Sequence, residues 1–149
     1  MALRFSYVYG PYSYHKGSVI PEFFRQIRRG RELTIYGDGE QTRDFLYVAD
    51  VCQAIGAALE ADLPWGQAIQ LGTGEKTTIN SLLRLLRGVV GEARFPAVVY
   101  ALLCPGEVAR NFVAIDQARR VLHFHPQTRL VGGLQETGKW FCHGNRSEA

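Results

Sequence analysis

The stretch from Leu33 to Asp50, LTIYGDGEQTRDFLYVAD, constrains the fold most, because it combines two strand patterns, a tight turn and a helix start. Leu33–Tyr36 and Phe45–Val48 are short runs rich in β-forming side chains. The Gly-Asp-Gly sequence between them predicts a tight turn, since Asp-Gly tolerates positive φ angles. Asp50 is a natural N-cap for a helix that begins at Val51. We therefore expect strand, turn, strand and helix in close succession.

Arg43 lies between these two runs, directly before Asp44. A guanidinium offers a planar fork of donors that suits phosphate or carboxylate. The simpler interpretation is a surface ion pair with Asp44 or Glu40, which is the more frequent situation for an arbitrary arginine. Spacing alone leaves both interpretations open.

The rest of the chain alternates strand and helix patterns. Ser18 is expected to cap a helix over Val19–Arg29, and Thr78 to cap a helix that continues to Val90. Further expected strands and helices are Leu3–Tyr9, Val51–Ala61, Ala68–Leu71, part of Phe95–Leu103, Ile115–Leu122 and Leu130–Phe141. The positions of the second helix expected to face inward are Val51, Ile55, Ala58 and Leu59. The alternation favours an α/β layer arrangement.

Composition limits the class of protein. A chain of 149 residues, 46% hydrophobic and 21% charged, is expected to form one domain over residues 1–143, followed by a tail over 144–149. The net charge is only +3, and no apolar run is long enough to cross a bilayer, so neither nucleic acid nor membrane is expected as a partner. The dense basic group is expected to be a solvated helix end: Arg25, Arg28, Arg29 and Arg31.

The three cysteines are Cys52, Cys104 and Cys142, and their spacing fits neither a metal site nor a disulfide framework. We therefore expect a reducing, cytoplasmic compartment. His123 and His125 are expected in a surface turn rather than at a metal.

Two short motifs invite a catalytic or phosphate-binding interpretation. Gly72-Thr73-Gly74 follows a strand and precedes a helix, but it lacks the third glycine and the acidic partner of a dinucleotide loop. Tyr12 and Lys16 have the Tyr-x-x-x-Lys spacing of an acid/base pair, yet they follow Gly-Pro in an expected loop. We expect the first to be a plain turn and the second to be a coincidence.

The central stretch is accompanied by further segments, which occur in order along nearly the whole chain: Arg4–Pro11 (RFSYVYGP), Val19–Pro21, Pro105–Glu107, Ala118–Leu122 and Lys139–Phe141. Together these segments resemble, in the same order, the NAD-dependent epimerase/dehydratase family, the extended short-chain dehydrogenases that modify nucleotide sugars. This resemblance implies a nucleotide-diphosphate pocket. The residues implied to bind substrate are Ser18, Val19, Thr34, Tyr36, Arg43, Gln70 and Arg110.

The resemblance also implies a role for each. Arg43 and Arg110 would bind the diphosphate, Ser18 and Val19 would lie beside the base or ribose, and Thr34 and Tyr36 would line the base. Gln70 replaces a family Asn near the nucleotide and can still offer an amide. The chain departs from the family at Tyr7, which replaces a phosphate-contacting Asn, and at Leu103 and Cys104, where some members carry another phosphate-binding Arg.

In the family, the NAD loop and the catalytic Tyr/Lys pair precede the Tyr-Gly-Pro strand with which this chain begins. The resemblance therefore implies the C-terminal substrate-binding region of such an enzyme, an α/β arrangement of short strands and about four or five helices without the Rossmann half. No cofactor and no catalytic residue are expected in this chain, and we expect it to be inactive alone.

The expected partners are a nucleotide-diphosphate sugar, a second copy in a homodimer, or a separate NAD-binding chain. The alternative function is a non-catalytic interaction remnant, which would homo-oligomerise through the apolar surface left by the missing domain.

Overall fold

The computed structural model describes residues 1–62, 66–103, 106 and 108–143. The expected tail over 144–149 and the departure at Cys104 lie outside these residues. The helices are α1 (Val19–Arg28), α2 (Val48–Glu60), α3 (Ile79–Val90), α4 (Asp116–Leu122) and α5 (Leu130–His143), with a 3-10 turn at Glu92–Arg94. The strands are β1 (Ala2–Phe5), β2 (Tyr7–Tyr9), β3 (Leu33–Tyr36), β4 (Thr42–Arg43), β5 (Phe45–Tyr47), β6 (Ala68–Leu71), β7 (Thr77–Thr78) and β8 (Val98–Ala101).

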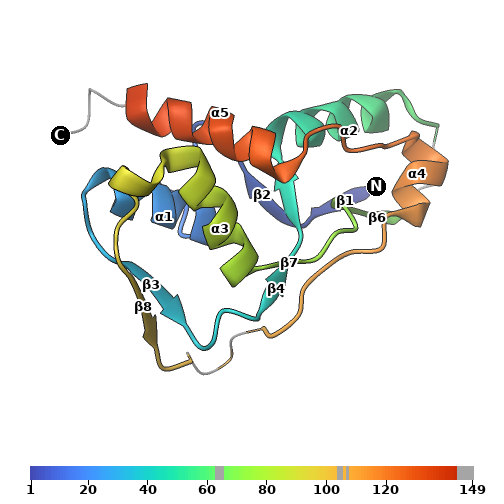
Figure 1. Cartoon of the computed structure of the whole chain (residues 1–149). Coiled ribbons are helices and arrows are strands. Elements are labelled where there is room, and N and C mark those ends of the chain that lie inside the picture. Colours follow the sequence, from blue (N-terminus) through green and yellow to red (C-terminus); the bar gives the residue numbers. More distant parts are fainter. Residues whose placement is uncertain (63–65, 104–105, 107, 144–149) are drawn as a thin grey trace.

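The described strands form two-stranded pairs. β1 pairs with β6, β2 with β5 and β3 with β8, all parallel, whereas β4 and β7 are antiparallel. Parallel partners need long crossover connections, which explains why helices separate them in the sequence. Figure 1 shows the β3–β8 pair at one end of the molecule and the β1–β6 pair at the other, with α5 running across α1 and α3.

The strand expected over Leu3–Tyr9 is divided at Ser6. The backbone amide of Ser6 donates to the carbonyl of Leu71 at 2.8 Å, and the next amide, that of Tyr7, donates to the carbonyl of Asp44 at 3.0 Å. The chain therefore changes partner from β6 to β5 at this point, and one expected strand becomes β1 and β2.

Two apolar cores hold the elements together. The first lies among α1, α3, α5 and the strands β2, β3 and β5, and its buried members include Phe24, Ile35, Leu82, Leu134 and Phe141. The second joins α2 and α4 to β5 and β6, and its members include Leu46, Ala54, Ile69, Leu71 and Ala118. Successive side chains of a strand point to opposite faces, so β5 contributes Phe45 to the first core and Leu46 to the second. This strand therefore lies between the two cores.

Of the two predicted N-caps at α1 and α3, the one at α3 is confirmed, whereas Ser18 precedes α1 without capping it. The Thr78 side chain accepts a hydrogen bond from the amide of Ser81, which confirms it as the N-cap of α3. Ser18 has the extended backbone of an N-cap at the start of α1, but its hydroxyl makes no capping hydrogen bond. This hydroxyl is buried and has no hydrogen-bond partner among the residues that the structure describes.

The predicted start of the second helix is wrong. α2 begins at Val48, so Asp50 lies inside its first turn and is only 1% exposed. The Asp50 carboxylate accepts hydrogen bonds from the amides of Gln127 (2.9 Å) and Thr128 (3.3 Å), and therefore fixes the approach to α5 instead of capping its own helix.

The inward face of α2 also differs from the expected one. Val51 and Ala58 are buried as expected, but Ala54 is the third buried apolar position, while Ile55 and Leu59 are exposed, Leu59 to 82%. The small side chains of Ala54 and Ala58 allow α2 to lie close to the second core, and the larger Ile55 and Leu59 lie beside this buried face, toward solvent.

Helix α5 approaches β2 and β5 closely at Tyr9 and Tyr47. The Tyr9 ring is 2% exposed, and its hydroxyl donates to the carbonyl of Leu130 at 3.4 Å. Burial raises the pKa of Tyr9 above its usual value, and the neighbouring Tyr47 and Asp50 raise it further. The phenol therefore stays neutral and packs as part of the core.

Candidate functional site

A cavity of about 310 Å³, here called the first cavity, opens between β3 and the start of α1. Its size lies at the lower end of the range of about 300–1,000 Å³ that is usual for small-molecule pockets. Its wall is formed by Tyr7, Gly17, Ser18, Val19, Glu22, Phe23, Thr34, Ile35, Tyr36, Gln41, Arg43 and Ile79. Five of the seven predicted substrate residues are in this wall.

Arg43 is the buried cation of the first cavity. It lies in β4, opposite Thr77 of β7, and is 5% exposed. Its Nη1 donates to the carbonyl of Thr42 at 2.8 Å and to the carbonyl of Val108 at 2.6 Å, and its guanidinium carbon lies 5.3 Å from the centre of the Tyr7 ring. A fixed, desolvated guanidinium at a cavity wall favours an anionic ligand. The surface position of the simpler interpretation does not agree with this burial.

The Asp44 carboxylate is hydrogen-bonded to the turn at residues 72–74. One carboxylate oxygen, Oδ1, accepts from the amide and the hydroxyl of Thr73 at 2.8 and 2.6 Å, and Oδ2 accepts from the amide of Gly74 at 3.0 Å. The amides of the Gly72-Thr73-Gly74 turn thus already hold a carboxylate. The turn does not fit the pyrophosphate of a dinucleotide, which agrees with its prediction as a plain turn.

Four other predicted residues surround Arg43 in the same wall. Ser18 and Val19 come from the start of α1, and Thr34 and Tyr36 come from β3. The Tyr36 side chain is 49% exposed while Ile35 beside it is buried, because alternate residues of a strand face opposite sides. A half-exposed phenol ring at the cavity edge suits stacking on a planar base.

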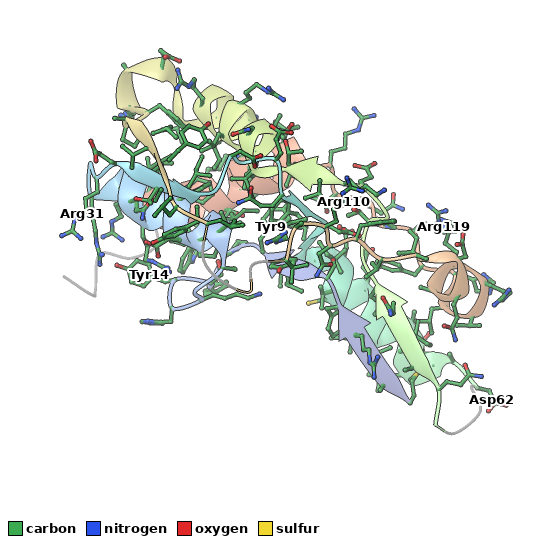
Figure 2. The ribbon with its side chains drawn as sticks, turned by 90° about the horizontal axis from the view of Figure 1, so that it is seen from below. Tyr9, Tyr14, Arg31, Asp62, Arg110 and Arg119 are labelled. Carbon is green, nitrogen blue, oxygen red and sulfur yellow. The ribbon has the colours of Figure 1, made fainter. Side chains whose placement is uncertain are left out.

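Gln70 and Arg110 lie elsewhere. Gln70 is on β6, where it pairs with Arg4 of β1, and it lines a second cavity of about 560 Å³. Arg110 is exposed, on the stretch between β8 and α4 (Figure 2), and its backbone forms a bridge with Thr42. The structure therefore brings Arg110 next to β4 in the backbone but not into the wall of the first cavity.

Glu22 and Gln41 line the first cavity and were not predicted. The Glu22 carboxylate accepts from Nε of Arg25 at 3.1 Å and from the Gln26 amide at 3.0 Å, so its charge is compensated. The Gln41 amide donates to the carbonyl of Tyr36 at 2.8 Å. The available signals were helical spacing from Ser18 to Glu22 and strand-like alternation from Gln41 to Arg43.

The other motif residues have structural roles or none in the site. Residues 12–16 form no helix, so Tyr12 and Lys16 do not share a helix face. Tyr12 is 88% exposed with a positive φ of 62°, and the Lys16 ammonium donates to the carbonyl of Val8 at 2.6 Å. His123 ends α4 with a left-handed backbone. Among the described residues no group of three or more His, Cys, Asp or Glu could hold a metal, and no helix has the length and hydropathy of a membrane span.

Comparison with known proteins shows which family the chain is similar to. The sequence profile of the NAD dependent epimerase/dehydratase family matches residues 1–72, which include Arg43 and most of the first-cavity wall. The chain is similar to this family over that segment. The resemblance stated from the sequence and the expected α/β class are thereby confirmed.

Relatives of the family are similar over nearly the whole chain. The UDP-glucose 4-epimerase of Mycolicibacterium smegmatis is 32% identical over 90% of this chain, which spans 42% of that enzyme. The crystal structure of the Thermotoga maritima UDP-glucose 4-epimerase with UDP-glucose has a TM-score of 0.84 and 34% identity, covering 94% of this chain and 45% of the epimerase. The Bacillus cereus UDP-glucuronic acid 4-epimerase, in complex with UDP-glucuronic acid and NAD, has a TM-score of 0.84 and 28% identity, with coverages of 94% and 44%.

The chain thus spans less than half the length of these epimerase-family relatives. Its described residues contain the first cavity, and in the glycine-containing turn at 72–74 the amides of Thr73 and Gly74 are bonded to Asp44.

Proposed function

We propose that this chain is the nucleotide-sugar-binding portion of an NAD-dependent sugar epimerase or dehydratase and is inactive alone. The observation that carries the proposal is the buried Arg43 guanidinium in the wall of a cavity that Tyr36 borders. Arg43 would bind the diphosphate through the positive charge of its buried guanidinium, and Tyr36 and Thr34 would contact the base. Ser18 and Val19 would lie beside the base or ribose.

The first cavity supplies binding and no chemical step. Its wall contains one acidic side chain, Glu22, and this carboxylate is bonded to Arg25 and Gln26. NAD and the acid/base pair would come from a region or a chain outside these residues. The exposed thiols of Cys52 and Cys142 support a reducing, cytoplasmic setting.

The proposal predicts that Arg43→Ala weakens the binding of UDP-glucose or dTDP-glucose by roughly tenfold or more, the effect of losing a charge-assisted contact worth about 1.5–3 kcal/mol. Isothermal titration calorimetry measures this directly. Arg43→Lys keeps the charge but not the fork, so an intermediate loss is expected. Urea unfolding of each variant separates lost binding from lost structure, since Arg43 also donates to the carbonyls of Thr42 and Val108.

Arg84→Ala is the matched control, because Arg84 is exposed on α3, where it donates to Ser81, and does not line the first cavity. Its affinity should equal that of the wild type. We expect a smaller loss for Arg110→Ala than for Arg43→Ala, because Arg110 lies outside the first cavity. Equal affinities of wild type and Arg43→Ala would reject the proposal.

The alternative, a non-catalytic interaction remnant, is favoured by one feature. Leu59 and Ile55 on α2 are exposed, as is Phe5 on β1, whose parallel pair with β6 includes no further strand among the described residues. Parallel sheets are usually covered on both faces, so a two-fold dimer is the simplest expectation. Light scattering should then give a dimer mass for the wild type and a lower mass for Leu59→Lys. A monomeric wild type at high concentration would contradict this alternative.

A further inference from the structure

The first cavity and the second cavity share a wall. Tyr7 and Ser18 line both of them. The second cavity is larger, about 560 Å³ against 310 Å³, and is bordered by polar side chains from separate elements, among them Lys16, Gln70 and Asn111. A ligand that starts at Tyr36 and Arg43 and extends toward Gln70 must therefore pass Tyr7 and Ser18.

The Tyr7 ring is held in place on two sides. Its backbone pairs with Phe45 in the β2–β5 ladder, and its ring meets the Phe45 ring edge-on with centroids 6.3 Å apart. The Arg43 guanidinium carbon lies 5.3 Å from the Tyr7 ring centre, within the range of a cation–π contact. Rotation of the ring out of the wall would lose both contacts, and Arg43 itself is fixed by two carbonyls.

Ser18 completes the wall beside Tyr7. Its hydroxyl is buried and lacks a hydrogen-bond partner within the described part of the chain. The first cavity offers the Arg43 guanidinium and aromatic rings, which suit a phosphate and a base. The second cavity also has a guanidinium and aromatic rings, from Arg4, Phe5 and Phe112, and it adds the amides of Gln70 and Asn111 and the Lys16 ammonium, which suit hydroxyl groups.

We propose that the Tyr7 ring closes the first cavity toward the second, so that this chain recognises the nucleoside diphosphate and gains no affinity from the attached sugar. The proposal rests on the proposed function, because it assumes that Arg43 holds the diphosphate. Tyr7 is then the residue that determines specificity between a nucleoside diphosphate and its sugar conjugate.

Calorimetry of the full chain with UDP and with UDP-glucose tests this, with the ratio of the two dissociation constants as the readout. In the wild type and in Tyr7→Phe, which keeps the ring, the ratio should be close to one. In Tyr7→Asn, which removes the ring, the second cavity becomes accessible. UDP-glucose should then bind about tenfold more tightly than UDP, the effect of one or two added hydrogen bonds. A ratio cancels any general weakening caused by loosening Arg43.

The possible results separate the two proposals. If neither ligand binds the wild type, the proposed function fails and this inference with it. If UDP binds and UDP-glucose binds the wild type about tenfold more tightly, only the closure by Tyr7 is overturned. This wild-type comparison decides even if Tyr7→Asn does not fold. An unchanged ratio in a folded Tyr7→Asn also overturns it.

Discussion

Asp44→Ala is expected to lower the free energy of unfolding by about 3 kcal/mol or more, because hydrogen bonds to a charged group contribute about 1.5–3 kcal/mol each. Asp44 is fully buried and accepts from the amide and hydroxyl of Thr73 and from the amide of Gly74. Alanine would remove the shared acceptor of these donors, which belong to the half-buried Thr73 and the exposed Gly74, and would leave space at a fully buried position. Urea unfolding followed by circular dichroism measures the change.

Two variants make the interpretation of Asp44→Ala specific. Asp44→Asn keeps one oxygen acceptor but presents an NH₂ group to a donor, so an intermediate loss is expected. Asp62→Ala removes an exposed carboxylate at the periphery (Figure 2) and should change stability by less than about 0.5 kcal/mol. An Asp44→Ala protein as stable as Asp62→Ala would show that the 72–74 turn is not held by this carboxylate.

Gly133→Ala is expected to destabilise the protein by about 1–3 kcal/mol, the usual effect of overpacking a core. A Cβ at position 133 of α5 would lie 2.8 Å from Cζ of Tyr9 and 2.9 Å from Cδ2 of Tyr47, and closer still to the Tyr9 hydroxyl. Both rings belong to paired strands and are packed edge-on, 5.4 Å apart, so neither can move away easily.

The neighbouring glycine provides the matched control for Gly133→Ala. A Cβ at Gly132, on the same helix, would meet no atom within 4 Å. Gly132→Ala should therefore stabilise α5 by about 0.5–1 kcal/mol through higher helix propensity. Thermal unfolding of the two variants should give shifts of opposite sign. Equal shifts would show that α5 does not pack on Tyr9 as closely as the structure indicates.

The candidate site was only partly predictable. The resemblance gave Ser18, Val19, Thr34, Tyr36 and Arg43, and the structure brings these residues into one wall. Glu22 and Gln41 were not predicted, because only their spacing from Ser18 and Arg43 indicated that they line the cavity. Gln70 and Arg110 lie outside the first cavity, because the pairing of β6 with β1 places Gln70 at the second cavity, and Arg110 meets β4 through a backbone bridge with Thr42.

Local pattern in the sequence determined the helices α1 and α3, the Thr78 cap and the short strands β3 and β6, because periodicity and capping depend on residues a few positions apart. Only the tertiary structure decided the break at Ser6, the inward turn of Asp50 and the bonding of Asp44 to the 72–74 turn. Each of these depends on a partner about thirty or more positions away, such as Leu71, Gln127 or Thr73, whose proximity no local pattern encodes.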